Sequence, residues 1–236
     1  METLSKKYPR SYHLPWSPGG TVDDKRMLDV SGLLGKPVVF TEKCDGSNLT
    51  YTRNEIFARS HGKVPDHRSF DLAKATHASI KYRIPEGLSV FCEYCYAVHS
   101  IEYVSLPSYS LVFGVRDDRT QEIWDWGMVE VLAEELGLPT VPRLGRGVIN
   151  TSADLYRITN DLAQRPSVFG GIREGLVIRL LKSFQEEDFS KYLAKWVRKD
   201  HVQTDEHWTK MPVRPQKLDR SKGSCNRLEF PTNLLV

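Results

Sequence analysis

Long apolar runs are missing from this sequence. No part of its 236 residues approaches the roughly 18 consecutive apolar residues of a membrane-spanning helix. The opening residues 1–7 are mostly polar and charged, so they lack the apolar centre of a secretory signal. We therefore expect a cytoplasmic protein with no membrane partner.

Cysteine is scarce, and its four positions are too irregularly spaced for a disulfide framework: Cys44, Cys92, Cys95 and Cys225. We expect reduced thiols. The Cys92-x-x-Cys95 spacing also occurs in zinc sites, but no second Cys or His pair stands at ligand spacing, and residues three apart on a strand point to opposite faces. Four histidines show no metal-binding spacing either: His61, His99, His201 and His207. The sequence therefore predicts no zinc centre.

Internal repeats and low-complexity tracts are also absent, and 40% hydrophobic with 27% charged residues is typical of a folded protein. We expect one domain over 1–236, with an irregular arm at 1–36 and a basic tail at about 205–236. The net charge of +3 is weak support for an anionic partner. The cations of the tail either clamp a phosphate backbone or stay solvated. They are Lys210, Arg214, Lys217, Arg220, Lys222 and Arg227.

Runs of β-branched and aromatic residues, bounded by turn residues, predict most of the regular structure. Strands are expected near 37–42, 48–52, 55–60, 88–97, 109–116, 174–181 and 194–198. Strands joined by hairpins and interrupted by separate helices indicate an α+β fold with mostly antiparallel sheets. A repeating βαβ alternation is absent.

Helical patterns are fewer. Four apolar residues share one helical face: Met128, Val131, Leu132 and Leu136. Gly137 is placed to terminate that helix. Three more residues share a face behind Ser152, a candidate N-cap: Leu155, Ile158 and Leu162. A third helix is expected over 68–80.

The most informative stretch is Lys43-Cys44-Asp45-Gly46-Ser47-Asn48. One strand run leads into it and another leads out, so Asp45-Gly46 marks a tight connection between them. On the residues alone, Lys43 is either a surface lysine in a hairpin or a nucleophilic amine. In the second role the amine must be neutral, which costs about 4.6 kcal/mol at pH 7. Burial, a bound metal and neighbouring basic side chains all lower a lysine pKa.

Three residues in or beside later strand runs are candidates for the same cleft. Glu93 lies in an almost wholly apolar run, where a carboxylate needs a partner, so it is either salt-bridged in the core or a ligand to substrate. Phe113 is either a core residue or a platform on which a base stacks. Arg59 precedes a glycine turn and is either solvated or directed at phosphate oxygens.

Two further stretches carry charge at the ends of strand runs. Glu174-Gly175-Leu176-Val177-Ile178-Arg179 places a glutamate and a glycine before a buried strand that closes on a basic residue. A carboxylate oxygen there suits Mg²⁺, which keeps several waters and bridges to phosphates. Lys195-Trp196-Val197-Arg198-Lys199 then follows with three basic residues in five.

In this order, the five stretches resemble the motifs of the covalent nucleotidyltransferases, which are the polynucleotide ligases and messenger RNA capping enzymes. Lys-x-Asp-Gly-x-Asn resembles their nucleotidyl-accepting motif, and the resemblance covers residues 43 to about 199. It implies a nucleotidyltransferase domain of packed, mostly antiparallel sheets with flanking helices and an active-site cleft between the sheets. It also implies ATP as adenylyl donor and Mg²⁺ or Mn²⁺ as metal.

The resemblance assigns roles to individual positions. It implies that Lys43, Glu174 and Lys195 are catalytic and that Glu174 binds the metal. The residues that it implies for ATP binding are Glu42, Lys43, Arg59, Glu93, Phe113 and Lys195. Val197 departs from the family, which usually has a second lysine there. That second contact is therefore Lys199, or Arg198 if a bulge intervenes.

Asn48 favours RNA as the substrate, since RNA ligases of the phage type carry asparagine there, whereas DNA ligases and capping enzymes usually carry arginine. The short segment after the fifth motif leaves no room for an oligonucleotide-binding (OB) domain, which also argues against those enzymes. We expect a monomeric, ATP-dependent RNA ligase that joins RNA 5'-phosphate and 3'-hydroxyl ends. The alternatives are a DNA ligase, a DNA 5'-end adenylating enzyme, or an inactive nucleic-acid-binding module.

Overall fold

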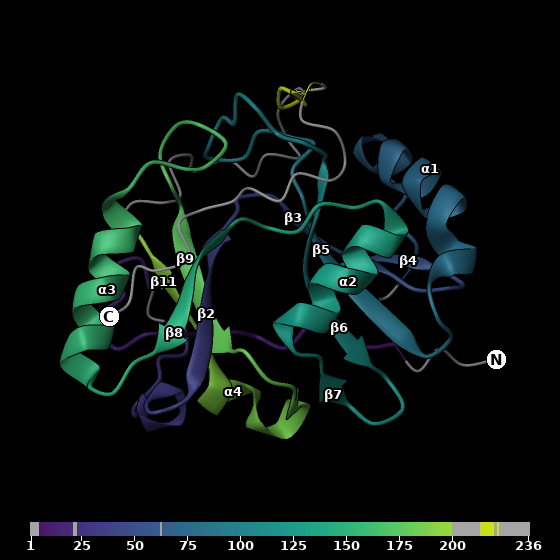
Figure 1. The fold of residues 1–236 in the computed structure, drawn as a ribbon. Helices are drawn as coiled ribbons and strands as arrows, with labels where there is room; N and C mark the ends of the chain where they lie inside the picture. Colours follow the sequence, from purple (N-terminus) through teal and green to yellow (C-terminus); the bar gives the residue numbers. More distant parts are fainter. Residues whose placement is uncertain (1–4, 21–22, 62, 200–212, 220, 222–236) are drawn as a thin grey trace.

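The computed structural model describes residues 5–20, 23–61, 63–199, 213–219 and 221 (Figure 1). Within them, the strands form two sheets that stand left and right in Figure 1. The strands are β1 (Tyr12–His13), β2 (Pro37–Lys43), β3 (Ser47–Tyr51), β4 (Ile56–Ala58), β5 (Leu88–Tyr94), β6 (Ser110–Asp117), β7 (Glu122–Ile123), β8 (Arg143–Val148), β9 (Gly175–Leu180), β10 (Phe184–Gln185) and β11 (Leu193–Val197). The helices are α1 (Asp71–Ile80), α2 (Trp126–Leu136), α3 (Ser152–Gln164) and α4 (Phe189–Tyr192), with short 3-10 turns at Ser31–Leu33, Arg68–Phe70, Lys81–Arg83 and Glu186–Asp188.

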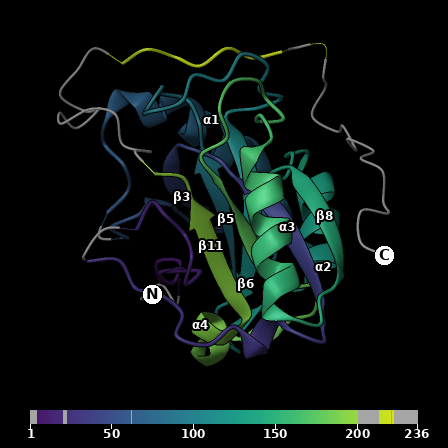
Figure 2. The ribbon, with the colours of Figure 1, turned by 90° about the vertical axis from the view of Figure 1, so that its left-hand side faces the viewer.

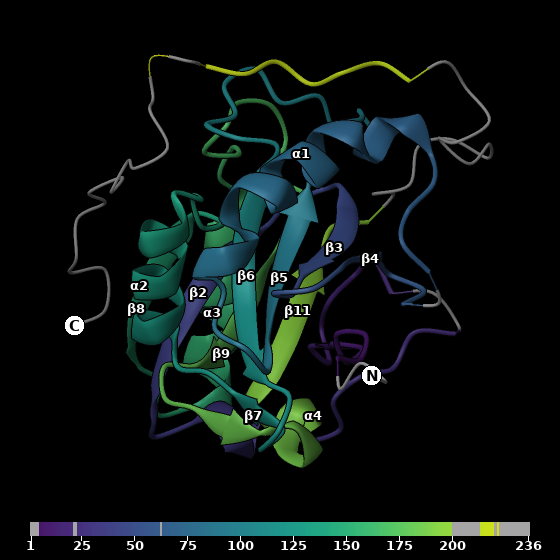
Figure 3. The same cartoon turned by 90° about the vertical axis from the view of Figure 1, so that its right-hand side faces the viewer.

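Most strand pairs are antiparallel, so the predicted α+β class is confirmed. The five-stranded sheet has the order β1-β11-β9-β2-β8, and only its β1–β11 pair is parallel. The six-stranded sheet has the order β10-β7-β6-β5-β3-β4 and is antiparallel throughout. Helix α3 covers the outer side of the first sheet (Figure 2), and α1 and α2 lie beside the second (Figure 3).

Strand β2 is buried on both faces and joins the two hydrophobic cores. Val38 and Phe40 pack in the core that also contains Leu155 and Leu162 of α3. Val39 points the other way, into the core of the six-stranded sheet and its helices. The two sheets therefore pack against each other through β2, and the end of this strand lies at the place where they meet.

The connection after Lys43 is short, as expected, but it is not a hairpin. Strands β2 and β3 belong to different sheets, and residues 44–46 carry the chain from one to the other. The nucleotidyl-accepting stretch is thus a crossing between sheets. Its glycine has a steric reason, because a Cβ at Gly46 would stand 2.7 Å from the carbonyl oxygen of Tyr94.

The predicted face of α2 and the predicted N-cap of α3 need adjustment, whereas the face of α3 formed by Leu155, Ile158 and Leu162 packs on the core as expected. In α2 the buried face contains Val129, Leu132 and Leu136, whereas Met128 and Val131 are about half exposed. Gly137 ends α2 with a φ of 72°, as its position predicts. The N-cap of α3 is Thr151, whose side chain accepts from the Asp154 amide, and Ser152 is already helical.

The segment at 1–36, expected to be an irregular arm, contains a strand and a helical turn. Tyr12 and His13 form β1 beside β11, and the turn at Ser31–Leu33 follows. A second segment, which we call the strap (residues 213–219), crosses the loop that follows β5, at the top of Figure 3. No helix among the described residues combines the length and apolar character that crossing a bilayer requires.

Candidate active site

A cavity of about 680 Å³ opens between the two sheets, at the end of β2. All of the site positions predicted from the sequence contribute to its lining: Glu42, Lys43, Arg59, Glu93, Phe113, Glu174 and Lys195. These residues come from strands or strand ends of both sheets. The structure thus gathers positions spread over most of the chain, while their catalytic and binding roles remain predictions.

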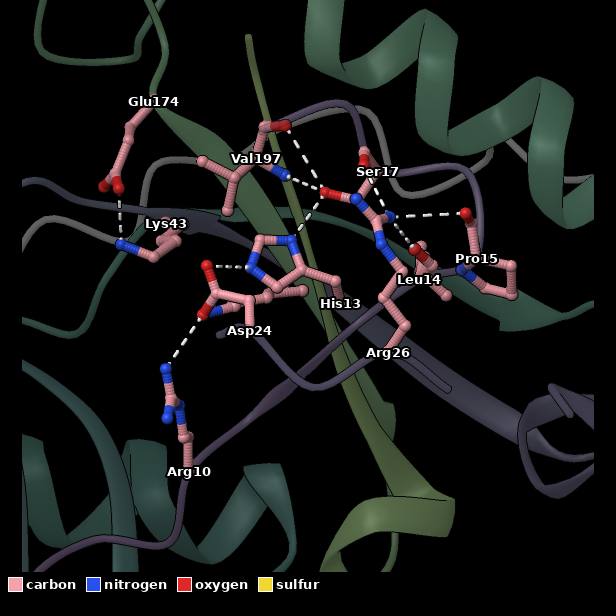
Figure 4. A network of polar contacts seen from close by, with 11 residues as sticks. Arg10, His13, Leu14, Pro15, Ser17, Asp24, Arg26, Lys43, Glu174 and Val197 are labelled. Carbon is pink, nitrogen blue, oxygen red and sulfur yellow. Dashed lines mark hydrogen bonds and ion pairs between the residues drawn. The ribbon is translucent and has the colours of Figure 1, made fainter. Parts of the chain in front are cut away.

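Lys43 and Glu174 form the central pair of the cavity. Lys43 is paired in register with Gly175 at the start of β9, so Glu174 reaches it from the neighbouring strand. Their Nζ and Oε1 atoms are 2.6 Å apart (Figure 4). The other carboxylate oxygen of Glu174, Oε2, is buried and has no hydrogen-bond partner among the described residues.

The neighbours of Lys43 are acidic. Burial lowers its pKa, but Glu174, Glu93 and Asp45 raise it by more, so the pKa of Lys43 lies above its ordinary value. From the sequence we expected nearby basic side chains to lower the pKa of Lys43, but its acidic neighbours raise this pKa. With these neighbours alone, Lys43 is a protonated ammonium group.

Glu93 lies on β5, opposite Asn48 of β3. Its Oε1 accepts the backbone N–H of Gly46 at 3.0 Å. Burial raises the pKa of Glu93 to about 7, against the opposing effect of Lys43 and with further raising by Glu174 and Asp45. The partner that a carboxylate in this apolar strand requires is therefore the Lys43–Gly46 stretch, not a core arginine.

Asp45 fixes the crossing between the sheets. Its Oδ2 accepts the backbone N–H groups of Ser100 and Ile101 at 2.7 and 2.9 Å, and its own N–H donates to the Tyr103 hydroxyl at 2.8 Å. The loop after β5 is thereby attached to the stretch that carries Lys43. Asp45 therefore has a positioning role that its place in the sequence did not reveal.

Phe113 reaches the cavity wall by a local irregularity of β6. The register shifts so that Phe91 pairs with Gly114 and Cys92 with Val112, which leaves Phe113 as the extra residue of a β-bulge. Its ring makes an edge contact with Tyr8 at 4.9 Å between centroids. Arg59 follows the end of β4 and is exposed at the cavity rim.

Strand β11 supplies one basic side chain to the cavity. Lys195 lies 3.8 Å from Asp24, measured from Nζ to Oδ1. Burial lowers the pKa of Lys195, with Asp24 opposing and Lys43 adding to the effect. Val197 faces the cavity two residues later, whereas neither Arg198 nor Lys199 is among the described residues that line it.

Glu42 has its carboxylate engaged away from Lys43. One oxygen accepts the Ser167 hydroxyl at 2.5 Å, and the other accepts the Val168 N–H at 3.0 Å and lies 3.4 Å from the Arg173 guanidinium. Adjacent residues of a strand point to opposite faces, which explains the difference from Lys43. The carboxylate of Glu42 thus holds the 167–173 segment, while the nucleotide contact expected of Glu42, which also lines the cavity, stays a prediction.

The N-terminal arm contributes to the cavity, which no motif in the sequence indicates. Arg10, His13 and Asp24 also line the cavity, and Figure 4 shows Asp24 between the other two. Asp24 is 3.2 Å from Arg10 and 3.6 Å from His13. The only available signal was the density of charged residues in an arm otherwise rich in proline and glycine, and that pattern is typical of solvated loops.

Glu174 remains the best candidate for a metal ligand. Its buried, unpartnered Oε2 and the equally buried, unpartnered Oδ1 of Asn48 are oxygen donors of the kind that Mg²⁺ and Mn²⁺ prefer. No group of three or more His, Cys, Asp or Glu side chains suited to a metal occurs in the part of the chain that the structure describes. The residues therefore fit a cation held by few protein oxygens, with phosphates and water as the other ligands.

Two packed, mostly antiparallel sheets with a lysine-centred cavity between them are the architecture that the resemblance to the nucleotidyltransferase superfamily of polynucleotide ligases implied. A sequence model of the RNA ligase family matches residues 36–197. The chain therefore belongs to the RNA ligase family. A comparison with curated protein sequences gives no match.

Solved structures of a Naegleria gruberi RNA ligase are similar to this chain. A mutant in its apo form has a TM-score of 0.58 at 15% identity, over 86% of this chain and 58% of that one. A mutant with ATP and Mn has a TM-score of 0.59 at 14% identity, over 86% and 59%. The ligase with pyrophosphate has a TM-score of 0.55 at 16% identity, over 84% and 57%. The shared feature is the fold, and our chain spans less than two thirds of the length of these proteins.

Proposed function

We propose that this chain is an ATP-dependent RNA ligase that joins RNA 5'-phosphate and 3'-hydroxyl ends through a covalent lysyl-adenylate. The observation that carries this proposal is the Lys43–Glu174 pair in a cavity that also holds Glu93 and Lys195. Membership of the RNA ligase family supports it. So does the fold shared with a ligase whose structures contain ATP, AMP and Mn.

The first step transfers AMP to the protein. The Lys43 Nζ attacks the α-phosphorus of ATP, a P–N bond forms, the bond to the bridging oxygen breaks, and pyrophosphate leaves with the electron pair. Lys43 must release its proton and its contact with Glu174 before it attacks. Covalent catalysis then divides one difficult joining reaction into easier displacements.

Two further displacements complete the joining. An oxygen of the RNA 5'-phosphate attacks the AMP phosphorus, the P–N bond breaks, and Lys43 regains a proton. The 3'-hydroxyl of the other RNA end then attacks the 5'-phosphorus, and AMP leaves. Phosphoryl transfers of this kind depend mainly on positioning and charge neutralisation.

The other cavity residues have proposed roles in holding the nucleotide. Phe113, which the β-bulge turns toward the cavity, stacks on the base, and Glu93 accepts hydrogen bonds from the ribose hydroxyls. Lys195 contacts phosphate oxygens, and Arg59 at the rim faces phosphates or the RNA end. A divalent cation at Glu174 supplies positive charge that offsets both this carboxylate and the triphosphate.

Asn48 and the family match support RNA over DNA as the substrate. Further features support the remaining parts of the proposal. All of the predicted site residues lie on one chain, which supports a monomer. The free, buried thiols of Cys44, Cys92 and Cys95 fit a reducing compartment such as the cytoplasm.

The direct test is transfer of label from α-labelled ATP to the protein in the presence of Mg²⁺ or Mn²⁺. Wild-type chain should retain a label that survives denaturation and alkali but is released by acid, as a P–N bond is, and Lys43→Ala should not. Lys36→Ala is the matched control, because Lys36 is exposed and lies just before the start of the same strand. Labelling of Lys43→Ala equal to that of the control contradicts the proposal. Sealing of nicks that differ only in a 3' ribose or deoxyribose then separates an RNA ligase from a DNA ligase.

A further inference from the structure

Positive charge gathers around one carboxylate at the Lys195 side of the cavity. Arg10 and Lys195 approach the same oxygen of Asp24, at 3.2 and 3.8 Å, and His13 lies 3.6 Å from the other oxygen. Figure 4 shows Arg10 and His13 directed at Asp24 from the N-terminal arm. An arginine, a lysine and an imidazole thus share one anionic group.

The arm that carries Arg10 is fixed to β11 by backbone hydrogen bonds. Leu14 N–H donates to the Lys195 carbonyl at 2.8 Å, and Gly19 N–H donates to the Val197 carbonyl at 2.9 Å. The hydroxyl of Ser17 accepts the Val197 N–H at 2.9 Å. Because His13 of β1 pairs with Lys195 of β11, the backbone that leads from Arg10 is held beside Lys195.

The segment that carries Asp24 is held in the same way. The His13 N–H donates to the Lys25 carbonyl, and the Met27 N–H donates to the His13 carbonyl, both at 2.8 Å. The Arg26 guanidinium donates to the carbonyl of Ser17 at 2.7 Å. Asp24 is therefore a built-in counter-ion for Arg10 and Lys195.

The cavity is electrostatically polarised. Three carboxylates surround Lys43, those of Glu174, Glu93 and Asp45, whereas cations outnumber carboxylates beside Lys195. The Arg10 side chain is 49% exposed, so it can turn from Asp24 to a ligand without losing a buried contact. Guanidinium and ammonium groups held this way attract phosphate oxygens, and the fork of arginine suits them best.

We propose that Arg10 and Lys195 form a subsite for the pyrophosphate part of ATP, with Asp24 as the counter-ion that the ligand displaces. This inference rests on the proposed function. When the bond from the α-phosphorus to the bridging oxygen breaks, the electron pair passes to the departing pyrophosphate. Arg10 and Lys195 stabilise that charge, and Arg10 thus joins the site from outside the five motif-like stretches.

Calorimetric titration with inorganic pyrophosphate tests the subsite without relying on turnover. Arg10→Ala should bind pyrophosphate about tenfold or more weakly than wild type, while its affinity for AMP stays unchanged. Arg10→Lys should recover part of the loss. Lys25→Ala is the matched control, since Lys25 is an exposed cation of the same arm outside the cavity lining. Equal pyrophosphate affinity of wild type and Arg10→Ala, or no binding to wild type, overturns the proposal.

Asp24→Asn should change the affinity for pyrophosphate in the opposite direction. Removing the counter-ion leaves both cations for the ligand, so pyrophosphate should bind more tightly, by about threefold to tenfold. A general loss of structure in the arm would instead weaken binding in both variants. Weaker binding to Asp24→Asn therefore contradicts the subsite.

Two kinetic measurements distinguish ATP from RNA as the source of the phosphate that Arg10 binds. Arg10→Ala should raise the KM for ATP in formation of the lysyl-adenylate but leave the sealing of pre-adenylated RNA unchanged, because that step involves no pyrophosphate. A defect confined to pre-adenylated RNA assigns Arg10 to the RNA phosphate and overturns our proposal. If wild-type chain takes no label from ATP, the proposed function fails, while the pyrophosphate titration still decides whether the subsite exists.

Discussion

At the scale of single residues, the sequence identified the groups around the nucleophile but not their electrostatic effect. Lys43, Glu93 and Glu174 were predicted to share a cleft, and they line one cavity. That the pKa of Lys43 is raised could not be deduced, because it depends on the distances of three carboxylates that are separated along the chain. The same limit applies to Glu42, whose partners lie far along the chain.

Glu93 should make stability depend on pH. Its pKa is about 7 in the folded chain, against an ordinary value of 4.5. Between these values the folded chain binds more protons than the unfolded chain, so the free energy of unfolding falls as pH rises through this window and stays lower above it. Glu93→Gln removes this pH-dependent loss, so the stability of the variant relative to wild type should increase by about 3 kcal/mol between pH ~4 and ~8. Denaturant unfolding over a pH series measures the difference, and parallel curves for the two proteins contradict it.

Asp45 should contribute to stability as well as to activity. Asp45→Ala leaves the Ser100 and Ile101 N–H groups without their acceptor, which should lower the free energy of unfolding by about 2–3 kcal/mol. Asp45→Asn keeps one acceptor oxygen and should fall between wild type and the alanine variant. Chemical denaturation gives the three values, and equal stability of Asp45→Ala and wild type argues against this attachment.

At the scale of elements, local patterns predicted where strands and helices occur but not which way they face. Strand β2 was correctly placed, yet its neighbour β3 lies in the other sheet, and nothing local to residues 44–46 distinguishes a crossing from a hairpin. In α2, apolar residues are so frequent that two overlapping faces are possible. Packing against β6 and the loop beside it selects the face of Val129 and not that of Met128 and Val131.

Gly175 should be required for the contact between β9 and β11. A Cβ there would collide with the carbonyl oxygen of Trp196, which would push apart the strands that carry Glu174 and Lys195. Gly175→Ala should lower the free energy of unfolding by about 2 kcal/mol or more and reduce adenylate formation. Gly145→Ala is the matched control, because a Cβ on β8 meets nothing within 4 Å, and its effect should stay within about 0.5 kcal/mol. Thermal unfolding and labelling with ATP measure both effects, and equal values for the two variants contradict the steric account.

At the scale of the whole molecule, the α+β class was predicted from the mixture of hairpin-like strands and separate helices, but the order of the strands was not. The five-stranded sheet joins β1, β11, β9, β2 and β8, which are far apart in sequence. The resemblance to nucleotidyltransferases predicted the cleft between the sheets, but it covers the chain only from Lys43 onward. The arm with Arg10 and Asp24 lay outside it. The parallel pairing of β1 with β11, together with the backbone hydrogen bonds of His13 with Lys25 and Met27, brings these residues to the cavity.

The strap connects the far end of the described chain to the nucleophile. Gln216 is buried, its Oε1 accepts the Tyr103 N–H at 2.7 Å, and its Nε2 donates to the Ile101 carbonyl at 2.6 Å. The same loop holds Asp45 through backbone N–H groups and the Tyr103 hydroxyl. A chain of direct contacts therefore runs from the strap to the turn after Lys43. The two tail cations in the strap, Arg214 and Lys217, lie near Glu102, and the tail's other predicted cations lie outside the described residues.

Loss of the Gln216 side chain should therefore disturb adenylate formation from a distance. Gln216→Ala leaves the Tyr103 N–H and the Ile101 carbonyl without partners, which should loosen the loop and slow labelling of Lys43 by about tenfold. Hydrogen exchange at the Ser100 and Ile101 amides should accelerate in this variant, since their protection depends on the loop staying against Asp45. Lys217→Ala, at the exposed neighbouring position, should change neither quantity. If exchange at these amides stays slow in Gln216→Ala while labelling falls, the strap acts by another route than Asp45.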